Sequence, residues 1–282
     1  MKDFTGKVAA ITGAGSGMGR ALAMSLANQG CHVAISDVDT DNLHETEALI
    51  QAEALIHAEA LIQTEVRVTC HTIDVSNKLD VKNFASAVQQ QHGKVNMIFN
   101  NAGVSVTDTV EHMSIDDFEW LMNINFWGVV YGTRAFLPFL REQPEAHIIN
   151  TSSIFGTIAL PSQSAYNASK FAVRGFTYAL RQELADSNIG VSCVQPGGVK
   201  TNIVKNSRFV PSDNASPTKE EFVQKFESLA GLTSEQAAEQ ILKGVRKNKA
   251  QILVGKDAKF IALLERLFPI GYQKITGRLD KG

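Results

Sequence analysis

The sequence predicts one domain of the α/β class, built as a doubly wound parallel sheet in a three-layer αβα arrangement. Short apolar runs typical of strands alternate with longer segments of helical periodicity along most of the chain. The strand candidates are apolar on both faces, as in a parallel sheet that helices cover on both sides. The chain has 282 residues, 44% of them hydrophobic, and no linker divides it.

Each strand is expected from an apolar run that ends at a polar or turn-forming residue. The first, at residues 8–11, reads Val-Ala-Ala-Ile and stops at Thr12-Gly13. The remaining strands are expected at residues 31–36, 95–99, 147–150, 191–194 and 251–254, with one more directly before Asp74.

Helices are expected between these strands. They are predicted at residues 18–28, 77–91, 114–140 and 163–187, and another begins at Thr233. Gly30 follows the first helix, and Pro138 lies near the end of the long helix at residues 114–140. Thr233 and Gln236 have the spacing of a capping box, which indicates a helix start.

The alternation stops after Pro196-Gly197-Gly198. Residues 201–232 are polar and rich in Ser, Asn, Lys and Pro, which predicts an irregular segment. Long irregular segments in compact domains are usually lids or binding loops. We therefore expect a catalytic domain at residues 1–254 that contains a substrate loop at residues 200–232.

A tandem repeat of six residues occupies residues 47–64 of the second helical segment. Its three copies each begin with Glu-Ala-Leu-Ile, a strongly helical composition. A period of six residues turns an α-helix by a net angle of about 240°, so the Leu-Ile pairs face three directions. Two interpretations stay open: a duplication that lengthens a surface helix, or a protruding helix that packs on another subunit.

Residues 255–282 are predicted to form a basic amphipathic tail. Phe260, Leu263, Leu264, Leu267 and Phe268 follow helical spacing, with six basic and three acidic residues around them. Such a helix can fold back over its own domain, pack on a neighbouring subunit, or make weak contact with a membrane surface.

Composition and charge argue against several classes of function. The formal net charge of −2 gives no case for nucleic-acid binding, and no stretch is long and apolar enough for a membrane span. The first residues show no signal-peptide core, and Cys31, Cys70 and Cys193 show neither a disulfide framework nor metal-ligand spacing. We expect a cytoplasmic protein with no metal in its site.

A glycine-rich turn joins the first strand to the first helix. Residues 12–19 follow the pattern T-G-x-x-x-G-x-G rather than the common G-x-G-x-x-G. Glycines let the backbone approach a pyrophosphate, and the helix N-terminus favours its negative charge. The turn predicts a Rossmann-like dinucleotide site that includes Thr12, Gly13, Gly15, Ser16, Gly17, Met18 and Gly19.

Asp37 falls at the end of the second expected strand. A carboxylate there can accept hydrogen bonds from the ribose hydroxyls of an adenosine, and it would repel a 2′-phosphate. No basic residue at position 16 or 38 offsets its charge. The sequence therefore favours NAD over NADP as the cofactor.

Tyr166 and Lys170 are four residues apart in a segment expected to be helical, so they share one helix face. A phenol is a poor acid or base at neutral pH, and a nearby ammonium favours its ionised form. The pair is therefore a candidate acid/base device, although the five-residue pattern alone is weak.

The ordered set of motifs resembles the classical short-chain dehydrogenase/reductase family. The resemblance covers roughly residues 5–201. Its motifs are the glycine turn at 12–19, Asp74-Val75, Asn100-Asn101-Ala102-Gly103, the segment 125–128, Ser153, Tyr166 with Lys170, and the segment 196–201. The stretch from Asp37 to Asp74 is about a dozen residues longer than is usual in the family, and two copies of the repeat account for the excess.

The resemblance implies an oxidoreductase that interconverts a secondary alcohol and a carbonyl compound by hydride transfer to or from a nicotinamide. Tyr166 resembles the general acid/base, and Lys170 the lysine that binds the nicotinamide ribose and lowers the pKa of the tyrosine. Ser153, rather than Ser152, would hold the substrate oxygen. Asn125, rather than Asn123, would hold a water of the proton relay.

The resemblance also implies further cofactor contacts. These are Asp74 and Val75 at the adenine, Asn101, Ala102 and Gly103 along the cofactor, and Pro196, Gly197, Val199 and Thr201 near the nicotinamide. It implies a homodimer or homotetramer, with the helices at 114–140 and 163–187 at the interface.

The substrate is expected to be a small, apolar alcohol or carbonyl compound. Its pocket is predicted around Ser105, residues 154–160 and residues 202–232, whose apolar members are Phe155, Ile158, Leu160, Ile203, Phe209 and Phe222. Two other functions stay open: a catalytically silent dinucleotide-sensing regulator, and a peripheral membrane reductase of lipid-like carbonyls.

Overall fold

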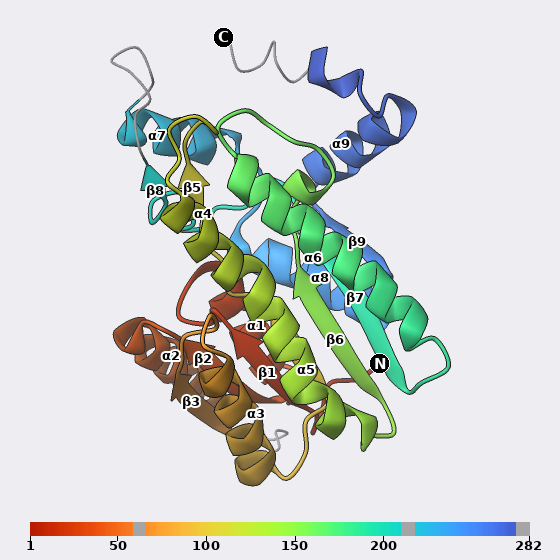
Figure 1. Ribbon diagram of the computed structural model, residues 1–282. Coiled ribbons are helices and arrows are strands. Elements are labelled where there is room, and N and C mark those ends of the chain that lie inside the picture. Colours follow the sequence, from red (N-terminus) through yellow and green to blue (C-terminus); the bar gives the residue numbers. More distant parts are fainter. Residues whose placement is uncertain (59–65, 210–217, 275–282) are drawn as a thin grey trace.

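The computed structural model describes residues 1–58, 66–209 and 218–274 (Figure 1). Within these ranges the chain forms a parallel sheet of seven strands in the order β3-β2-β1-β4-β6-β7-β9. The strands are β1 (Val8–Thr12), β2 (His32–Asp37), β3 (Val68–Thr72), β4 (Met97–Asn100), β6 (Ala146–Thr151), β7 (Ile189–Pro196) and β9 (Gln251–Val254). The strand order reverses between β1 and β4, which in this type of sheet is where ligands bind.

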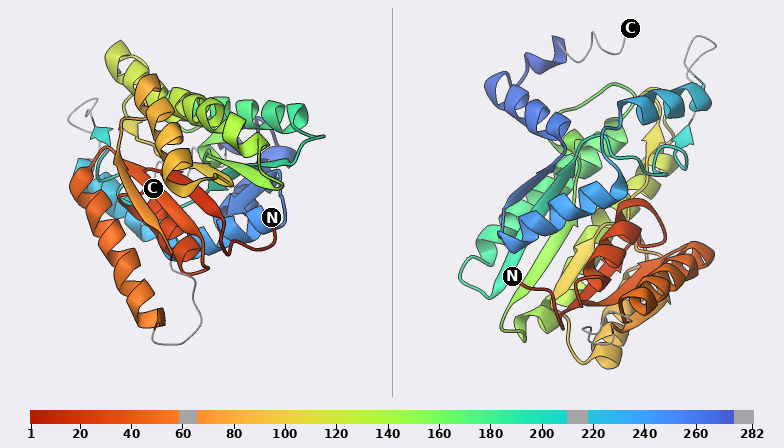
Figure 2. Two further views of the ribbon diagram at one scale, coloured as in Figure 1. Left: turned by 90° about the horizontal axis from the view of Figure 1, so that it is seen from below. Right: turned by 180° about the vertical axis from the view of Figure 1, so that it is seen from behind.

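Helices cover both faces of the sheet. One face carries α1 (Gly17–Ala27), α2 (Thr40–Ala58) and α8 (Ser234–Arg246), which Figure 2 shows from behind in red, orange and blue. The other carries α3 (Lys78–His92), α5 (Gly128–Arg141) and α6 (Ser164–Glu183). The predicted doubly wound, three-layer single domain is confirmed.

Alternate residues of β1 divide the core into two layers. Ala9 and Ile11 pack in the cluster that contains α1 and α8 side chains, whereas Val8 and Ala10 pack in the cluster that contains Phe136 of α5. Each residue of β1 is buried, because helices lie on both sides of it. This explains why the strand candidates are apolar without alternation.

The segment predicted as one helix at residues 114–140 contains a π-helical turn. Ser114 caps α4 (Ile115–Met122) by accepting a hydrogen bond from the N–H of Asp117. The π-helical turn, Asn123–Trp127, then leads into α5. A π-turn adds a residue to the helical repeat and often marks a functional position.

The prediction that residues 201–232 are irregular is wrong in part. The short strand β8 (Arg208–Phe209) pairs with β5 (Val106–Thr107), and α7 spans Lys219–Leu229. Thr218 and Glu221 form a capping box at the start of α7. The polar composition hid a helical spacing of apolar positions within residues 222–229. Residues 210–217 and the side chain of Phe222 lie outside the described part.

Helix α2 contains the first two copies of the repeat, and residues 59–64 lie outside the described part. In the first copy Ile50 is buried in the core, whereas Leu49 is exposed. Adjacent apolar side chains of the repeat therefore have different environments.

The tail is helical as predicted, over α9 (Lys256–Leu267). Ala258 is buried, and the Tyr272 hydroxyl accepts a hydrogen bond from the N–H of Ala159 (3.0 Å). The tail thus packs partly on its own domain, with Phe260, Leu263 and Leu267 exposed. Residues 275–282 lie outside the described part. Among the described helices, none combines the length and the apolar character that a membrane span requires.

Candidate active site

The loops after β1 and β4 are hydrogen-bonded to each other at the point where the strand order reverses. The Thr12 hydroxyl accepts hydrogen bonds from the N–H groups of Asn101 (3.0 Å) and Ala102 (3.1 Å). In return, the Asn101 amide donates to the Thr12 carbonyl (3.1 Å). The loops are close enough to form one edge of a binding site.

This close approach requires glycine at two positions of the turn. Gly13 has φ +66°, and a Cβ there would lie 2.7 Å from the Ala102 Cα. A Cβ on Gly19 would lie 1.9 Å from the Gly13 carbonyl oxygen. Because these neighbours are backbone atoms, a larger residue at Gly13 or Gly19 would displace the loop itself.

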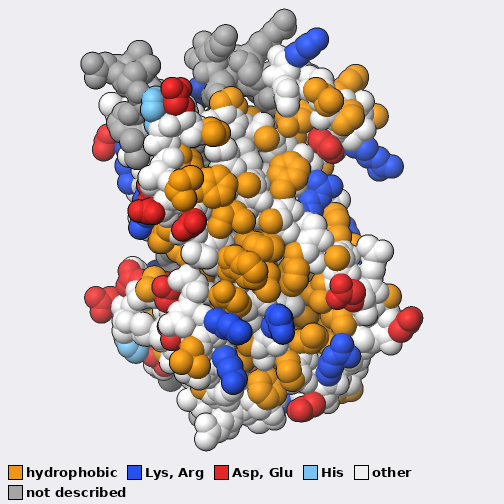
Figure 3. Space-filling view, in the orientation of Figure 1, with side chains coloured by type: hydrophobic (Ala, Val, Ile, Leu, Met, Phe, Trp, Pro, Cys, Tyr) orange, Lys and Arg blue, Asp and Glu red, His pale blue; other side chains and the backbone are white. Residues whose placement is uncertain are grey.

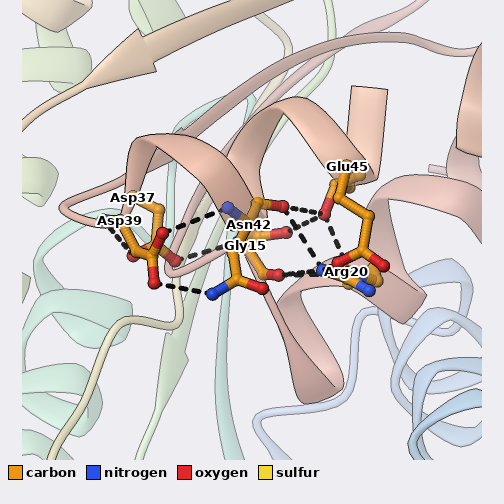
Figure 4. A network of polar contacts seen from close by, with 8 residues as sticks. Gly15, Arg20, Asp37, Asp39, Asn42 and Glu45 are labelled. Carbon is orange, nitrogen blue, oxygen red and sulfur yellow. Dashed lines mark hydrogen bonds and ion pairs between the residues drawn. The ribbon is translucent and has the colours of Figure 1, made fainter. Parts of the chain in front are cut away.

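Asp37 and Arg20 hold opposite sides of the Gly15 peptide groups (Figure 4). The Asp37 carboxylate accepts a hydrogen bond from the Gly15 N–H (2.9 Å). The Arg20 guanidinium donates to the Gly15 carbonyl (Nε–O 3.1 Å) and pairs with Glu45 of α2. The loop conformation is therefore tied to both β2 and α2.

The other predicted residues of the glycine turn lie at the start of α1. Ser16 is the N-cap residue, and Met18 packs against the core. Gly17 has φ +52°, and a Cβ there would lie 3.3 Å from Thr201. The turn thus faces the segment after β7.

Asp74 and Val75 follow β3 but have different surroundings. The Asp74 carboxylate is exposed and accepts hydrogen bonds from the N–H and hydroxyl of Ser76. Val75 is buried, and a Cβ on Gly128 of α5 would lie 3.1 Å from its side chain. Val75 therefore helps to set how α5 approaches the sheet edge.

The loop after β7 is held by the C-terminal segment. Pro196 ends β7, and Val199 forms a bridge with Leu232. The Gly198 N–H donates to the Asp257 carboxylate at the start of α9 (2.6 Å). Gly197 packs against the same carboxylate so closely that a Cβ would lie 2.0 Å from its oxygen.

Tyr166 and Lys170 lie on one face of α6, with the lysine Nζ 5.5 Å from the centre of the phenol ring. Lys170 is fully buried and donates a hydrogen bond to the Thr151 carbonyl (3.1 Å). Among the described residues, no carboxylate forms an ion pair with it. Within the described part of the chain the Thr151 carbonyl is its one hydrogen-bond acceptor, which leaves donors of the ammonium for a ligand.

Burial changes the proton affinities of both groups. It raises the pKa of the Tyr166 phenol to about 12, and the hydrogen bond with the Ser153 side chain offsets only part of that rise. Burial also lowers the pKa of the Lys170 ammonium to about 8. The sequence led us to expect that the ammonium lowers the pKa of the phenol, but desolvation outweighs that effect here.

Ser153 and Ser152 have different roles in the fold. The Ser152 hydroxyl donates to the Lys170 carbonyl (2.7 Å), which ties β6 to α6. The Ser153 hydroxyl accepts from the N–H of Phe155 (3.1 Å) and hydrogen-bonds to Tyr166. Ser153 is therefore the serine that lies beside the phenol.

Asn125 is buried within the π-turn, whereas Asn123 is exposed. Its amide accepts from the Val104 N–H (2.8 Å) and donates to the Val104 carbonyl (2.9 Å) and the Ser169 hydroxyl (3.2 Å). These bonds join the π-turn to the loop after β4 and to α6. The side chain therefore positions three elements and has little capacity left to hold a water itself.

The side chains of Asn125 and Lys170 both approach Gly103, in the loop after β4. A Cβ placed there would lie 3.2 Å from the Asn125 Oδ1 and 3.4 Å from the Lys170 Nζ. Four segments, the loop after β4, the π-turn, the turn after β6 and α6, thus meet at the carboxyl edge of the sheet. They bring together a phenol, a hydroxyl and a buried ammonium, a set suited to proton transfer at an oxygen atom.

Two positioning residues were not predicted from the sequence, Arg20 and Asp257. Arg20 directly follows the glycine turn, and Asp257 follows the last strand by three residues. Neither lies in a recognisable motif. Arg20 acts through the backbone carbonyl of Gly15, and Asp257 acts on a loop that is distant in the sequence.

The fold and the site define a class of protein, a doubly wound α/β domain with a glycine-rich turn where the strand order reverses and with a serine, a tyrosine and a lysine beside it. A family model described as short chain dehydrogenase matches residues 7–209. The chain belongs to the short-chain dehydrogenase family of oxidoreductases.

Relatives that match most of the chain agree with this assignment. The chain is 42% identical to SadH of Mycobacterium tuberculosis over 278 residues, which cover 98% of this chain and 96% of that protein. It is 32% identical to levodione reductase of Leifsonia aquatica over 223 residues, 78% of this chain and 80% of that protein.

A solved structure has the same fold. The crystal structure of a short-chain dehydrogenase/reductase from Burkholderia phymatum, in complex with NAD, matches with a TM-score of 0.82 and 32% identity. The match covers 94% of this chain and 95% of that one.

Proposed function

We propose that the protein interconverts an alcohol and the corresponding carbonyl compound, a secondary alcohol and a ketone or a primary alcohol and an aldehyde, with NAD(H) as the hydride carrier. The observation that carries this proposal is the placement of Tyr166 beside Ser153 and Lys170, at the sheet edge where the glycine turn lies. The phenol is protonated at neutral pH, since the ordinary pKa of a tyrosine is about 10 and burial raises that of Tyr166 further, to about 12. It is therefore available as a proton donor to a carbonyl oxygen.

The residues present fit a nicotinamide dinucleotide. Lys170 has unused donors beside Gly103, and the Asn101 Oδ1 is buried without a partner among the described residues. Both atoms belong to segments predicted to line the cofactor. The Asp37 carboxylate at the Gly15 loop favours a ribose with free hydroxyls, and the NAD complex of the Burkholderia relative agrees with this preference.

Each catalytic residue has a separate task. Ser153 would hold the substrate oxygen beside the phenol, and Tyr166 would donate its proton to that oxygen in reduction and remove it in oxidation. Lys170 would bind the ribose and stabilise negative charge on the phenolate. Asn125 would keep the loop after β4, the π-turn and α6 in register. The nicotinamide, when bound, supplies or accepts the hydride.

Three segments would enclose the substrate: residues 154–160, the loop after β4, and residues 200–232. Ile158 and Val204 are buried in the first and third segments, and Phe155 packs edge-on against Tyr166 with ring centres 6.1 Å apart. These neighbours favour an apolar alcohol or ketone. One of the relatives described above is a levodione reductase.

Substrate-dependent oxidation of NADH and NADPH with a panel of ketones tests this proposal. Tyr166→Phe should lower kcat by about 10²–10⁴-fold while leaving NADH binding intact, because general acid catalysis contributes that much. Tyr178→Phe, on the same helix, is the matched control. If NADH binds but no ketone or alcohol turns over, and Tyr166→Phe changes nothing, the silent dinucleotide sensor is the better function.

An exposed apolar surface on α9 favours a second candidate, a reductase that acts at a membrane. Phe260, Leu263 and Leu267 lie on one side of the helix, with Lys259 and Arg266 beside them. Flotation with anionic vesicles tests it. Binding by the unaltered chain that is lost in Phe260→Ser/Leu267→Ser would support this candidate, and equal behaviour would reject it.

We also propose that the protein forms a homodimer or homotetramer through α4, α5 and α6. Figure 3 shows hydrophobic side chains across this face. Trp127, in the π-helical turn between α4 and α5, and Phe171 of α6 are exposed. Trp127→Glu should shift the mass measured by light scattering towards the monomer, and an unchanged mass would place the interface elsewhere.

A further inference from the structure

Three side chains that can bind metals come together at the edge of the sheet, away from the catalytic residues. His44 and Glu47 are one turn apart on α2, with the His44 Nδ1 3.4 Å from a Glu47 oxygen. Cys70 lies on the edge strand β3, next to α2 (Figure 1). The imidazole nitrogen, the carboxylate oxygen and the thiol sulfur all lie within 4.8 Å of one another.

The fold explains why the three side chains converge. Alternate residues of a strand point to opposite faces, and Val68 and Cys70 pack with the core cluster that contains the α2 residues Leu43 and Ile50. Cys70 therefore points towards α2. His44 and Glu47 are three residues apart, the spacing that puts two helical side chains on one face.

The ligand chemistry selects the kind of cation. A nitrogen, a sulfur and an oxygen ligand suit Zn²⁺, whereas Mg²⁺ and Ca²⁺ take oxygen ligands. Tetrahedral zinc bonds require ligand atoms about 3.5 Å apart, so a closure of about 1 Å by the exposed His44 side chain and the partly buried Glu47 and Cys70 completes the site. Three protein ligands leave the fourth position to water.

We propose that His44, Glu47 and Cys70 form a zinc site that fastens α2 to the edge strand β3. Zn²⁺ replaces the thiol proton of Cys70, which passes to the solvent, and the imidazole binds in its neutral form. The site lies where α2 enters the repeat, since Glu47 is the first residue of the first copy. A cation there would hold the lengthened helix against the sheet.

Titration of the chelator-treated full chain with Co²⁺, used in place of Zn²⁺, tests the proposal. The chain has three cysteines, and Cys31 and Cys193 are fully buried. A thiolate-to-cobalt charge-transfer band in the folded protein therefore reports Cys70. We expect a band that saturates at one Co²⁺ per chain and disappears when Zn²⁺ is added.

Variants identify the ligands. Cys70→Ser should abolish the band, and His44→Ala should weaken Co²⁺ binding by at least about tenfold. His112→Ala, which removes an exposed histidine elsewhere, should leave binding unchanged. Zn²⁺ should raise the unfolding temperature of the unaltered chain and of His112→Ala, but not that of Cys70→Ser.

A second measurement needs no substitution. Zn²⁺ should slow alkylation of Cys70 in the unaltered chain, as located by mass spectrometry. No cobalt band, a band that persists in Cys70→Ser, or alkylation that Zn²⁺ leaves unchanged would each overturn the proposal. None of these readouts depends on turnover, so the zinc site and the proposed oxidoreductase activity fail or succeed separately.

Discussion

The Asp257 carboxylate accepts a hydrogen bond from the Gly198 N–H, with the two atoms 2.6 Å apart. Gly198 belongs to the loop after β7, and Asp257 lies in the first turn of α9. Gly197 must be glycine for this contact, because a Cβ there would collide with the carboxylate. The C-terminal segment therefore positions the loop after β7, which we propose to contact the nicotinamide.

Asp257→Ala should weaken cofactor binding. A solvent-exposed hydrogen bond contributes about 1 kcal/mol, so we expect KM for NAD to rise about fivefold with a smaller change in kcat. Steady-state kinetics with varied NAD measures this. Lys256→Ala, one residue away, should behave like the unaltered protein. An unchanged KM in Asp257→Ala would mean that the loop keeps its position without α9.

The pH dependence of reduction should reflect Lys170. Burial keeps the Tyr166 phenol protonated up to a pKa of about 12, whereas it lowers the pKa of Lys170 to about 8. As pH rises, Lys170 therefore loses its proton before Tyr166 does, and the site loses its positive charge. We expect kcat/KM for ketone reduction to fall as pH rises through about 8.

Alcohol oxidation should respond to pH in the opposite sense, because it releases a proton and needs the phenol as a base, and the small ionised fraction of the phenol grows with pH below its pKa of about 12. Rate profiles in both directions with one alcohol–ketone pair measure the contrast. Lys170→Met should reduce ketones more slowly than the unaltered protein, and its remaining rate should no longer decrease as pH rises through about 8. A reduction rate that stays level well above pH 8 in the unaltered protein would contradict the assignment.

Asp37 should determine the choice between NAD and NADP. Its carboxylate lies against the Gly15 N–H, and a 2′-phosphate placed nearby would meet a like charge. Asp37→Asn should lower the ratio of kcat/KM for NAD to that for NADP by at least about tenfold. Asp39→Asn is the control, since Asp39 bonds to Asn42 rather than to Gly15. Equal ratios in the two variants would exclude Asp37 as the determinant.

The sheet and the catalytic pair could be predicted because their signals are local. Apolar runs identify buried strands, and Tyr166 and Lys170 are four residues apart on a helix. The choice of Asn125 over Asn123 came from the family resemblance. In the structure the π-turn gives the physical difference, since one side chain is buried and the other exposed.

The features that could not be predicted depend on distant contacts or on competing effects. Asp257 meets Gly198 only after the last strand has paired with β7, and Cys70 meets His44 only after β3 has joined β2. The pKa of Tyr166 depends on how completely the site is buried, which no spacing reveals. Helix α7 was missed because polar composition outweighed its apolar spacing.

His147 should make the fold sensitive to acid. It is 1% exposed on β6, and its Nε2 lies 2.8 Å from the Ser192 hydroxyl. That hydroxyl donates its own proton to the Lys249 carbonyl, so it must accept a hydrogen bond from the imidazole. The neutral imidazole therefore carries its proton on Nε2 and none on Nδ1. Burial, together with the charges of the N-terminal ammonium and Arg181, lowers the pKa of His147 to about 3.

The direction of the effect follows from proton linkage. The unfolded chain has a histidine with a pKa of about 6.5 and takes up a proton below that pH, whereas the folded chain does not until about 3. The contribution of His147 to the free energy of unfolding is therefore complete above about pH 6.5 and declines as pH falls towards 3. His92, with a pKa lowered to about 4, adds to the same trend.

Urea unfolding between about pH 7 and pH 5 measures this decline. His147→Gln should be less stable than the unaltered protein at neutral pH, because a glutamine does not fill the space of the imidazole. Its free energy of unfolding should nevertheless change less than that of the unaltered protein between about pH 7 and pH 5. His112→Ala, an exposed histidine, should show the same pH dependence as the unaltered protein. An equal decline in His147→Gln and in the unaltered chain would show that other groups cause the acid sensitivity.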